Sequence, residues 1–274
     1  TLHMAKVLYL RLIEKKRNEI VVFLSMSNLR FGLIGQSLQH SFSKQFFTDF
    51  FLKNGIDGSY ENLEFQRSDF LKSFFNDAVY NYNGLNVTIP YKAAVIPFLD
   101  SIDDEAKRIG AVNTIKVVSG RLIGYNTDVF GFRQSIKPFL TNKHEKAMVI
   151  GTGGASKAID FVLKKIGLDV LFISRHSKDS DNIFTYEEIN NYMVDACKLV
   201  VNCTPVGSYP LINDEVFFPY EHLSEEHLVI DLIYNPSKTI FLEKSENNGA
   251  QILNGSSMLR EQAMKSWQIW NQKN

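Results

Sequence analysis

This chain of 274 residues has few cysteines, no net charge and no long hydrophobic run. Cys197 and Cys203 are its only cysteines, which excludes a disulfide framework and favours two free thiols in a reducing cytosol. The 30 basic residues equal the 30 acidic ones, whereas proteins that bind nucleic acid carry a basic excess. No run approaches the roughly 18 apolar residues that a membrane span needs. We therefore expect a soluble, cytoplasmic protein that binds neither nucleic acid nor a membrane, with one large or two ordinary domains.

Residues 1–25 differ from the rest of the chain. Arg11 and the basic run 15–17 interrupt the apolar residues, and no small-residue cleavage site follows, so the segment does not resemble a secretory signal. Three origins remain open: an extra helix, a cloning artefact, or translation from upstream of a start at Met26. We favour the last two and treat residues 1–25 as an extension on which the function does not depend.

From Met26 onward, short β-rich runs alternate with helix-length segments, which is typical of α/β layers around a mainly parallel sheet. Strands are expected at 29–35, 60–65, 84–89, 111–118, 121–125, 147–150, 169–174, 199–202, 228–232 and 250–253. Helices are expected at 43–54, from Pro90, near 126–128, at 154–166 and at 256–270. Beyond Lys146 the pattern becomes a cleaner βαβ alternation. We therefore expect two packed domains, 26–125 and 126–255, that meet near Asn126.

A glycine-rich turn follows the expected strand 147–150. Gly151 would permit the tight turn, and Gly153 would let a pyrophosphate approach the backbone where the next helix begins. A purely structural turn would show similar glycines, but the strand–turn–helix context favours dinucleotide binding. The next strand ends in Ser174-Arg175-His176 rather than in the acidic residue that usually holds the ribose of NAD. Because the Arg175 guanidinium could clamp a 2′-phosphate, NADP is the preferred cofactor, with an ordinary surface arginine as the alternative.

Polar residues also gather at the ends of strands in the first half. Ser41 and Ser43 stand at the start of an expected helix, where a serine either caps the helix or contributes to binding a carboxylate. Asn86 and Thr88 alternate onto one face of a strand, and Lys92 follows closely. Such a lysine is usually solvated, but beside a carboxylate in a cleft it would relay a proton.

No HxxH, HExxH or CxxC pattern occurs, so we expect no metal.

Eight blocks of this sequence occur in the order found in one enzyme family. They are HSFSK, NVTIPYK, GAVNT, NTDVFGF, GTGGASKA, VNCTPVG, DLIYNP and NGSSMLREQA. From about Leu29 to Trp270 the chain resembles shikimate dehydrogenase, within the shikimate/quinate dehydrogenase family. The resemblance implies NADPH-dependent, reversible reduction of 3-dehydroshikimate to shikimate, on the pathway to chorismate and the aromatic amino acids. It also implies an N-terminal substrate domain, completed by the C-terminal helix 256–274, beside a Rossmann-type NADP domain.

The resemblance assigns roles to individual residues. Lys92 and Asp128 would be the catalytic pair. The substrate-binding residues would be Ser41 and Ser43 for the carboxylate, Thr88, Asn113 and Gln262 for ring hydroxyls, and Asn86 and Tyr234 in the same pocket. The cofactor-binding residues would be Gly151, Gly153, Gly154, Ala155, Ser174, Arg175 and Thr204. The family's usual Asn-Arg-Thr or Asn-Arg-Ser motif is Ser174-Arg175-His176 here, so only the arginine is retained.

Two other functions remain open at this point. A quinate/shikimate dehydrogenase that uses NAD would need room for an extra hydroxyl and would gain nothing from Arg175. A nucleotide sensor without catalysis would not need Lys92, Asp128 or Gln262, all of which are present. The protein is expected to act on a small molecule as a monomer or a homodimer.

Overall fold

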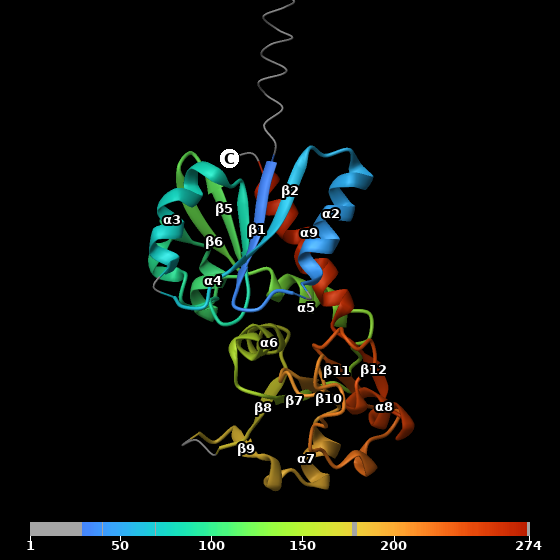
Figure 1. Ribbon diagram of the computed structural model, residues 1–274. Helices are drawn as coiled ribbons and strands as arrows, with labels where there is room; N and C mark the ends of the chain where they lie inside the picture. Colours follow the sequence, from blue (N-terminus) through green and yellow to red (C-terminus); the bar gives the residue numbers. More distant parts are fainter. Residues whose placement is uncertain (1–28, 40, 69, 177–179, 273–274) are drawn as a thin grey trace, which may run out of the picture.

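The computed structural model describes residues 29–39, 41–68, 70–176 and 180–272, so the extension 1–25 lies outside the described residues. Two six-stranded sheets lie one above the other in Figure 1, each covered by helices. The α/β fold class expected from the sequence is thus confirmed. Within the described segments, no helix combines the length and hydrophobicity needed to cross a bilayer.

The first sheet is mixed and has the strand order β2-β1-β3-β5-β6-β4. Its strands are β1 (Leu29–Gly35), β2 (Gly58–Glu64), β3 (Gly84–Val87), β4 (Ser101–Ile102), β5 (Thr114–Val118) and β6 (Arg121–Tyr125). Helix α2 (Phe42–Asn54) packs on one face with Phe47 and Phe51, and α3 (Phe70–Asn81) packs on the other with Leu71 and Phe75. Helix α2 ends at Asn54, as predicted, and Gly55 caps it in the left-handed conformation with φ 62°.

The second sheet is entirely parallel, with the order β12-β11-β10-β7-β8-β9. Its strands are β7 (Lys146–Ile150), β8 (Asp169–Ser174), β9 (Ile183–Thr185), β10 (Leu199–Asn202), β11 (Leu228–Asp231) and β12 (Gln251–Leu253). Helices α5 (Asp128–Ile136) and α6 (Gly154–Lys165) cover one face, while α7 (Asn191–Ala196) and α8 (Ile240–Asn247) contribute to the core on the other. This order is that of a Rossmann-type sheet, in which the glycine-rich turn follows the first strand, β7.

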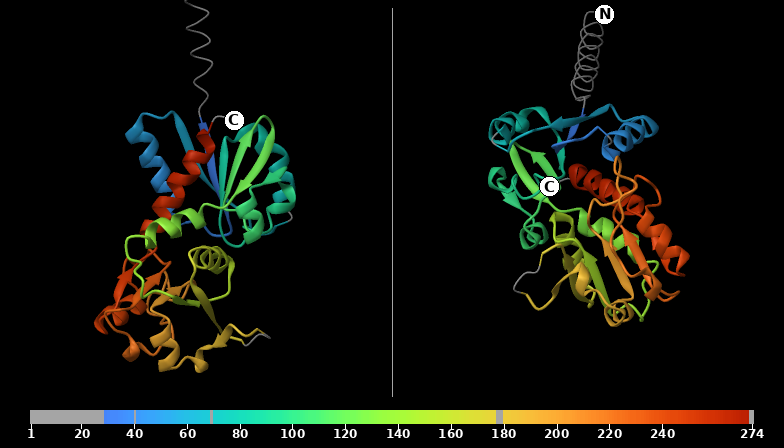
Figure 2. Two further views of the ribbon diagram at one scale, coloured as in Figure 1. Left: turned by 180° about the vertical axis from the view of Figure 1, so that it is seen from behind. Right: turned by 60° about the horizontal axis from the view of Figure 1, so that its bottom comes forward.

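The last helix, α9 (Ser256–Asn271), returns to the first sheet (Figure 2). The Trp270 ring stacks on Phe31 with centroids 4.6 Å apart, and its Nε1 donates to the carbonyl of Ile115 at 3.0 Å. Gly84 is required beneath this ring, because a Cβ there would lie 2.3 Å from the indole. Helix α9 therefore packs against β1, although the two elements lie far apart in the sequence, while the domain boundary near Asn126 stays a prediction.

The helix expected from Pro90 was wrong. Residues 90–95 form successive turns that lead into the short 3₁₀ helix η1 (Ile96–Phe98). Pro97 explains the difference, since a proline inside an α-helix removes a donor and clashes with the preceding turn. Lys92 therefore lies in a turn and not in a helix.

Candidate active site

A cavity of about 680 Å³ opens between the first sheet and the residues that follow strands of the second. The predicted residues that line it are Ser41, Ser43, Asn86, Thr88, Lys92, Asn113, Tyr234 and Gln262. The structure thus gathers every predicted substrate-binding residue and Lys92 around one space. Asp128 does not line the cavity but lies directly behind Lys92.

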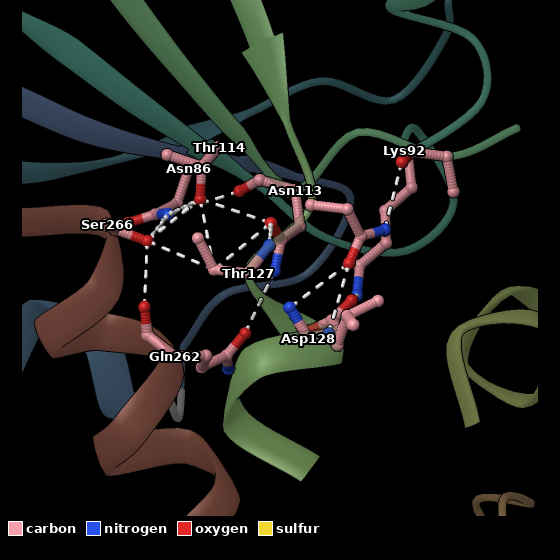
Figure 3. A network of polar contacts seen from close by, with 11 residues as sticks. Asn86, Lys92, Asn113, Thr114, Thr127, Asp128, Gln262 and Ser266 are labelled. Atoms are coloured by element: carbon pink, nitrogen blue, oxygen red, sulfur yellow. Dashed lines mark hydrogen bonds and ion pairs between the residues drawn. The ribbon is translucent and has the colours of Figure 1, made fainter. Parts of the chain in front are cut away.

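Lys92 and Asp128 form an ion pair, although the sequence separates them by 36 residues. The Lys92 Nζ lies 2.7 Å from Oδ2 of Asp128, and their side chains are 17% and 5% exposed (Figure 3). Asp128 is the first residue of α5, where the Oδ1 of Asn126 accepts from its backbone N–H at 3.1 Å. A carboxylate at a helix N-terminus is favoured by the helix dipole. The pair thus presents a positioned ammonium group, a potential proton donor, to the cavity.

Asn86 is the centre of a buried polar network (Figure 3). Its Oδ1 accepts from the Tyr60 hydroxyl at 2.8 Å, and its Nδ2 donates to Thr114 Oγ1 at 3.1 Å and Ser266 Oγ at 3.0 Å. A third contact runs from Nδ2 to the carbonyl of Asn113 at 3.1 Å. Burial raises the pKa of Tyr60 far above its usual value, so Tyr60 donates as a neutral phenol. Because each side-chain polar atom of Asn86 is engaged, Asn86 holds the shape of the cavity wall.

Asn113 and Gln262 join the first sheet to helix α9. Asn113 donates through Nδ2 to Gln262 Oε1 at 3.0 Å and accepts at Oδ1 from the Thr127 backbone N–H at 2.7 Å. The Nε2 of Gln262 and the hydroxyl of Thr88 have no hydrogen-bond partner among the described residues, and both residues line the cavity. These two groups are therefore available to polar groups of a ligand.

The N-terminal end of α2 forms another wall. Ser41, not Ser43, is the N-cap, and its Oγ accepts from the Lys44 backbone N–H at 3.5 Å. Ser43 lies in the first turn, so the alternative that it caps the helix was wrong. Tyr234 packs edge-on against Phe42 with ring centroids 5.9 Å apart, and burial raises its pKa. Two hydroxyls and a helix N-terminus thus meet on this side of the cavity, a combination suited to an anion.

Several cavity residues escaped the sequence analysis. Ser266 lies four residues after Gln262 on α9, a helical spacing that places both on one face and could have revealed it. Tyr209 and Pro210 reach the cavity from the segment after β10 in the second sheet. No local pattern marks them, because their position depends on how the two sheets are packed.

The glycine-rich turn lies at the carboxyl end of β7. Gly151 has φ 100°, and a Cβ there would lie 2.9 Å from Cγ2 of Thr204. Gly153 is the N-cap of α6, and a Cβ on Gly153 or Gly154 would meet no atom within 4 Å. Gly154 and Ala155 open the helix, whose first N–H groups have no partner within it. The turn thus leaves open space in front of a helix N-terminus, which fits a pyrophosphate.

The remaining predicted cofactor residues lie at the same edge of the sheet. Ser174 ends β8, and Arg175 follows it as an exposed side chain. Burial raises the pKa of Tyr186, and the charge of Arg175 offsets part of this rise. Thr204 follows β10, and its N–H and hydroxyl both donate to Asn202 Oδ1, at 2.9 and 2.7 Å. A guanidinium in place of a carboxylate after β8 fits NADP better than NAD. The predicted cofactor residues do not line the 680 Å³ cavity.

No group of three metal-ligating side chains was found in the described part of the chain.

A Rossmann-type sheet beside a cavity with a lysine–carboxylate pair at its wall is typical of the general class of dinucleotide-dependent oxidoreductases. Residues 33–115 match the family model of the shikimate dehydrogenase substrate-binding domain. The shikimate dehydrogenase (NADP(+)) of Clostridium beijerinckii is 38% identical over 88% of this chain and 92% of its own. The chain therefore belongs to the shikimate dehydrogenase family.

Solved structures agree with this assignment. A shikimate 5-dehydrogenase from Thermus thermophilus, in complex with NADP(H) and shikimate, matches with a TM-score of 0.79 and 31% identity, over 89% of this chain and 93% of its own. A quinate dehydrogenase from Corynebacterium glutamicum in complex with NAD also matches with a TM-score of 0.79, at 28% identity, over 89% and 94%. Both substrate specificities thus occur on this fold.

Proposed function

We propose that this protein is an NADP-dependent shikimate dehydrogenase that reversibly reduces 3-dehydroshikimate to shikimate. The observation that carries the proposal is the Lys92–Asp128 ion pair at the wall of a cavity lined by the predicted substrate-binding residues. The glycine-rich turn and Arg175 support NADP as the cofactor. In this proposal the protein acts in the cytoplasm on the pathway to chorismate, as a monomer or a homodimer.

The protein's own residues supply binding and proton transfer. When bound, NADPH supplies the hydride that reduces the ring ketone carbon. Lys92 protonates the carbonyl oxygen during reduction and removes that proton in the reverse direction, while Asp128 keeps its Nζ directed by the 2.7 Å ion pair.

Substrate orientation is assigned to the cavity walls. Ser41 and Ser43 hold the carboxylate at the N-terminus of α2, and Tyr234 closes the same side. The Thr88 hydroxyl and the Nε2 of Gln262, which have no hydrogen-bond partner among the described residues, bind ring hydroxyls together with Asn113. Holding the ring in one orientation turns hydride transfer into an effectively unimolecular step.

Initial rates of the purified protein test the proposal. Shikimate and quinate are each assayed with NADP⁺ and with NAD⁺, and we expect shikimate with NADP⁺ to give the highest kcat/KM, by about tenfold or more. A higher kcat/KM for quinate with NAD⁺ would identify a quinate dehydrogenase instead. Binding of NADP⁺ without turnover of either substrate would identify a nucleotide sensor.

A further inference from the structure

A second cavity, of about 620 Å³, lies along helix α6 and is lined by none of the predicted catalytic, substrate or cofactor residues. One end is formed by Thr152 and Ser156 beside the glycine-rich turn, and the other reaches Lys165 in the last turn of the helix. At 1.5 Å per residue, Ser156 and Lys165 are about 13 Å apart along the axis. The cavity therefore extends well away from the dinucleotide turn.

The cavity lies beside the short connection between β8 and β9. These two strands are parallel, and parallel neighbours are usually joined by a crossover helix that covers the sheet. The described residues between Ser174 and Ile183 contain no helix. Phe172 on β8 and Ile183 on β9 consequently line an open space beside Phe161 of α6, and Ile109 adds to the same floor.

Helix α4 (Asp104–Ile109) closes the cavity from the side of the first sheet. The Lys165 Nζ of α6 lies 2.9 Å from Glu105 Oε1 of α4, so an ion pair spans the two halves of the molecule. The site is thus built from both halves, and a ligand within it would contact both.

The charge of the lining is strongly positive. Arg108, Lys157, Lys164 and Lys165 are its cations, and Asp160 is its only carboxylate within the described chain. Asp160 is engaged by Lys164 at 2.9 Å and Glu105 by Lys165, which leaves Arg108 and Lys157 with no ion-pair partner among the described residues. An apolar floor under two uncompensated cations is complementary to an amphiphilic anion.

We propose that this cavity, termed the α6 groove, binds a small aromatic carboxylate or sulfonate, with its ring on Phe161, Phe172 and Ile183 and its anionic group near Arg108. The volume suits one small organic molecule. The groove shares no lining residue with the 680 Å³ cavity, so binding there is compatible with a bound substrate.

The probe is 8-anilinonaphthalene-1-sulfonate, an aromatic anion whose fluorescence rises in apolar surroundings. It is titrated into the full chain in the presence of saturating NADP⁺ and, in a separate series, of saturating shikimate, so that no turnover occurs, and we expect a saturable signal that persists in both series. Arg108→Glu should weaken the apparent affinity about threefold to tenfold, because it removes one attraction and adds a repulsion. Arg108 is exposed, so the variant should fold normally.

Lys107→Glu is the matched control, since it makes the same charge change at the adjacent exposed residue of α4, outside the cavity lining. An equal loss of affinity in both variants would show non-specific charge attraction and contradict the proposal. Complete displacement of the probe by NADP⁺ would show that it occupies the cofactor site. Loss of probe binding together with a doubled mass in sedimentation at high protein concentration would show that a second copy covers the groove. Absence of a saturable signal would also overturn the proposal.

Discussion

Lys92 differs from an ordinary surface lysine in both burial and partner. Its side chain is 17% exposed, and the carboxylate it contacts is 5% exposed, so this ion pair is screened by solvent far less than a surface pair. In the other lysine–carboxylate pairs described above, Lys164–Asp160 and Lys165–Glu105, the lysine side chain is exposed to solvent. The burial of both partners and the position of Lys92 at the cavity wall thus support the proposed role of this lysine in proton transfer.

Replacement of Lys92 by alanine should lower kcat for shikimate oxidation by about 10²- to 10⁴-fold, the usual contribution of a general acid or base. The KM for shikimate should change far less, since other cavity residues hold the substrate. Steady-state kinetics measure both constants. Lys53→Ala, at an exposed lysine in the last turn of α2, is the control and should leave kcat unchanged. An unaltered kcat in the Lys92 variant would remove the lysine from the mechanism.

The sequence predicted the site residues unevenly. Asn86 and Thr88 could be placed on one face by strand alternation, but nothing in a separation of 36 residues pairs Lys92 with Asp128. That pairing came from the resemblance to a family, and the structure then brought the two residues to 2.7 Å. Tyr209 remained unpredicted, because residues from different halves of a chain meet only through tertiary packing.

At the scale of elements, the turn between β7 and α6 depends on two glycines for different reasons. At position 151 the backbone requires glycine, because φ is 100° and a Cβ would lie 2.9 Å from Cγ2 of Thr204. Gly153 has an ordinary φ of −82° and open space around a Cβ. The protein itself therefore tolerates a methyl group at Gly153, whereas the approaching cofactor would not.

Alanine at these two positions should separate folding from cofactor binding. Gly151→Ala should destabilise the protein by about 1–3 kcal/mol, because it adds backbone strain and a close contact. Gly153→Ala should leave the thermal midpoint nearly unchanged but raise the KM for NADP⁺ several-fold. Thermal unfolding and initial rates measure the two effects. Equal thermal midpoints for both variants would contradict the strain argument, and an unchanged KM in Gly153→Ala would contradict close approach of the cofactor.

Most strands were predictable because their apolar runs end at turn residues. The hairpin between β5 and β6 is an example, since Ser119 and Gly120 take φ 50° and 73°, as a two-residue turn requires. Helix α3 was missed even though Leu71, Phe75 and Ala78 are buried at helical spacing. The helix predicted from Pro90 is the reverse error. Pro90 is favourable at the start of a helix, but the prediction neglected Pro97, which is unfavourable inside one.

For the molecule as a whole, His227 links stability to pH. It is 1% exposed, and its Nδ1 accepts from the Ser224 backbone N–H while Nε2 faces the Val194 carbonyl, each at 3.0 Å. Burial lowers the pKa of His227 below its usual 6.5. The native state therefore keeps this imidazole neutral at a pH where the unfolded chain has already bound a proton.

The free energy of unfolding should consequently be highest above about pH 6.5 and fall as the pH drops below it, since the unfolded state then binds more protons. Asp231 acts in the opposite direction, because burial raises the pKa of its carboxyl to about 6. A comparison of variants isolates the histidine. Urea midpoints between pH 5 and pH 8 should vary less in His227→Gln than in the parent chain, whereas His222→Gln should retain the parent dependence. If the urea midpoint depends on pH in the same way in all three proteins, His227 is not the source of the pH dependence of stability.

Helix α9 has a consequence for the order in which the protein becomes functional. Gln262 and Ser266 belong to the last helix, yet they complete a cavity whose other walls come from Ser41, Asn86 and Asn113. During synthesis, N-terminal parts generally fold first, at about 5–20 residues added per second. In a nascent chain that has formed β1 but not α9, the Phe31 ring still lacks its contact with Trp270. The cavity also still lacks the side-chain amide of Gln262. The substrate site can therefore be completed only after α9 has been synthesised and has packed against the first sheet.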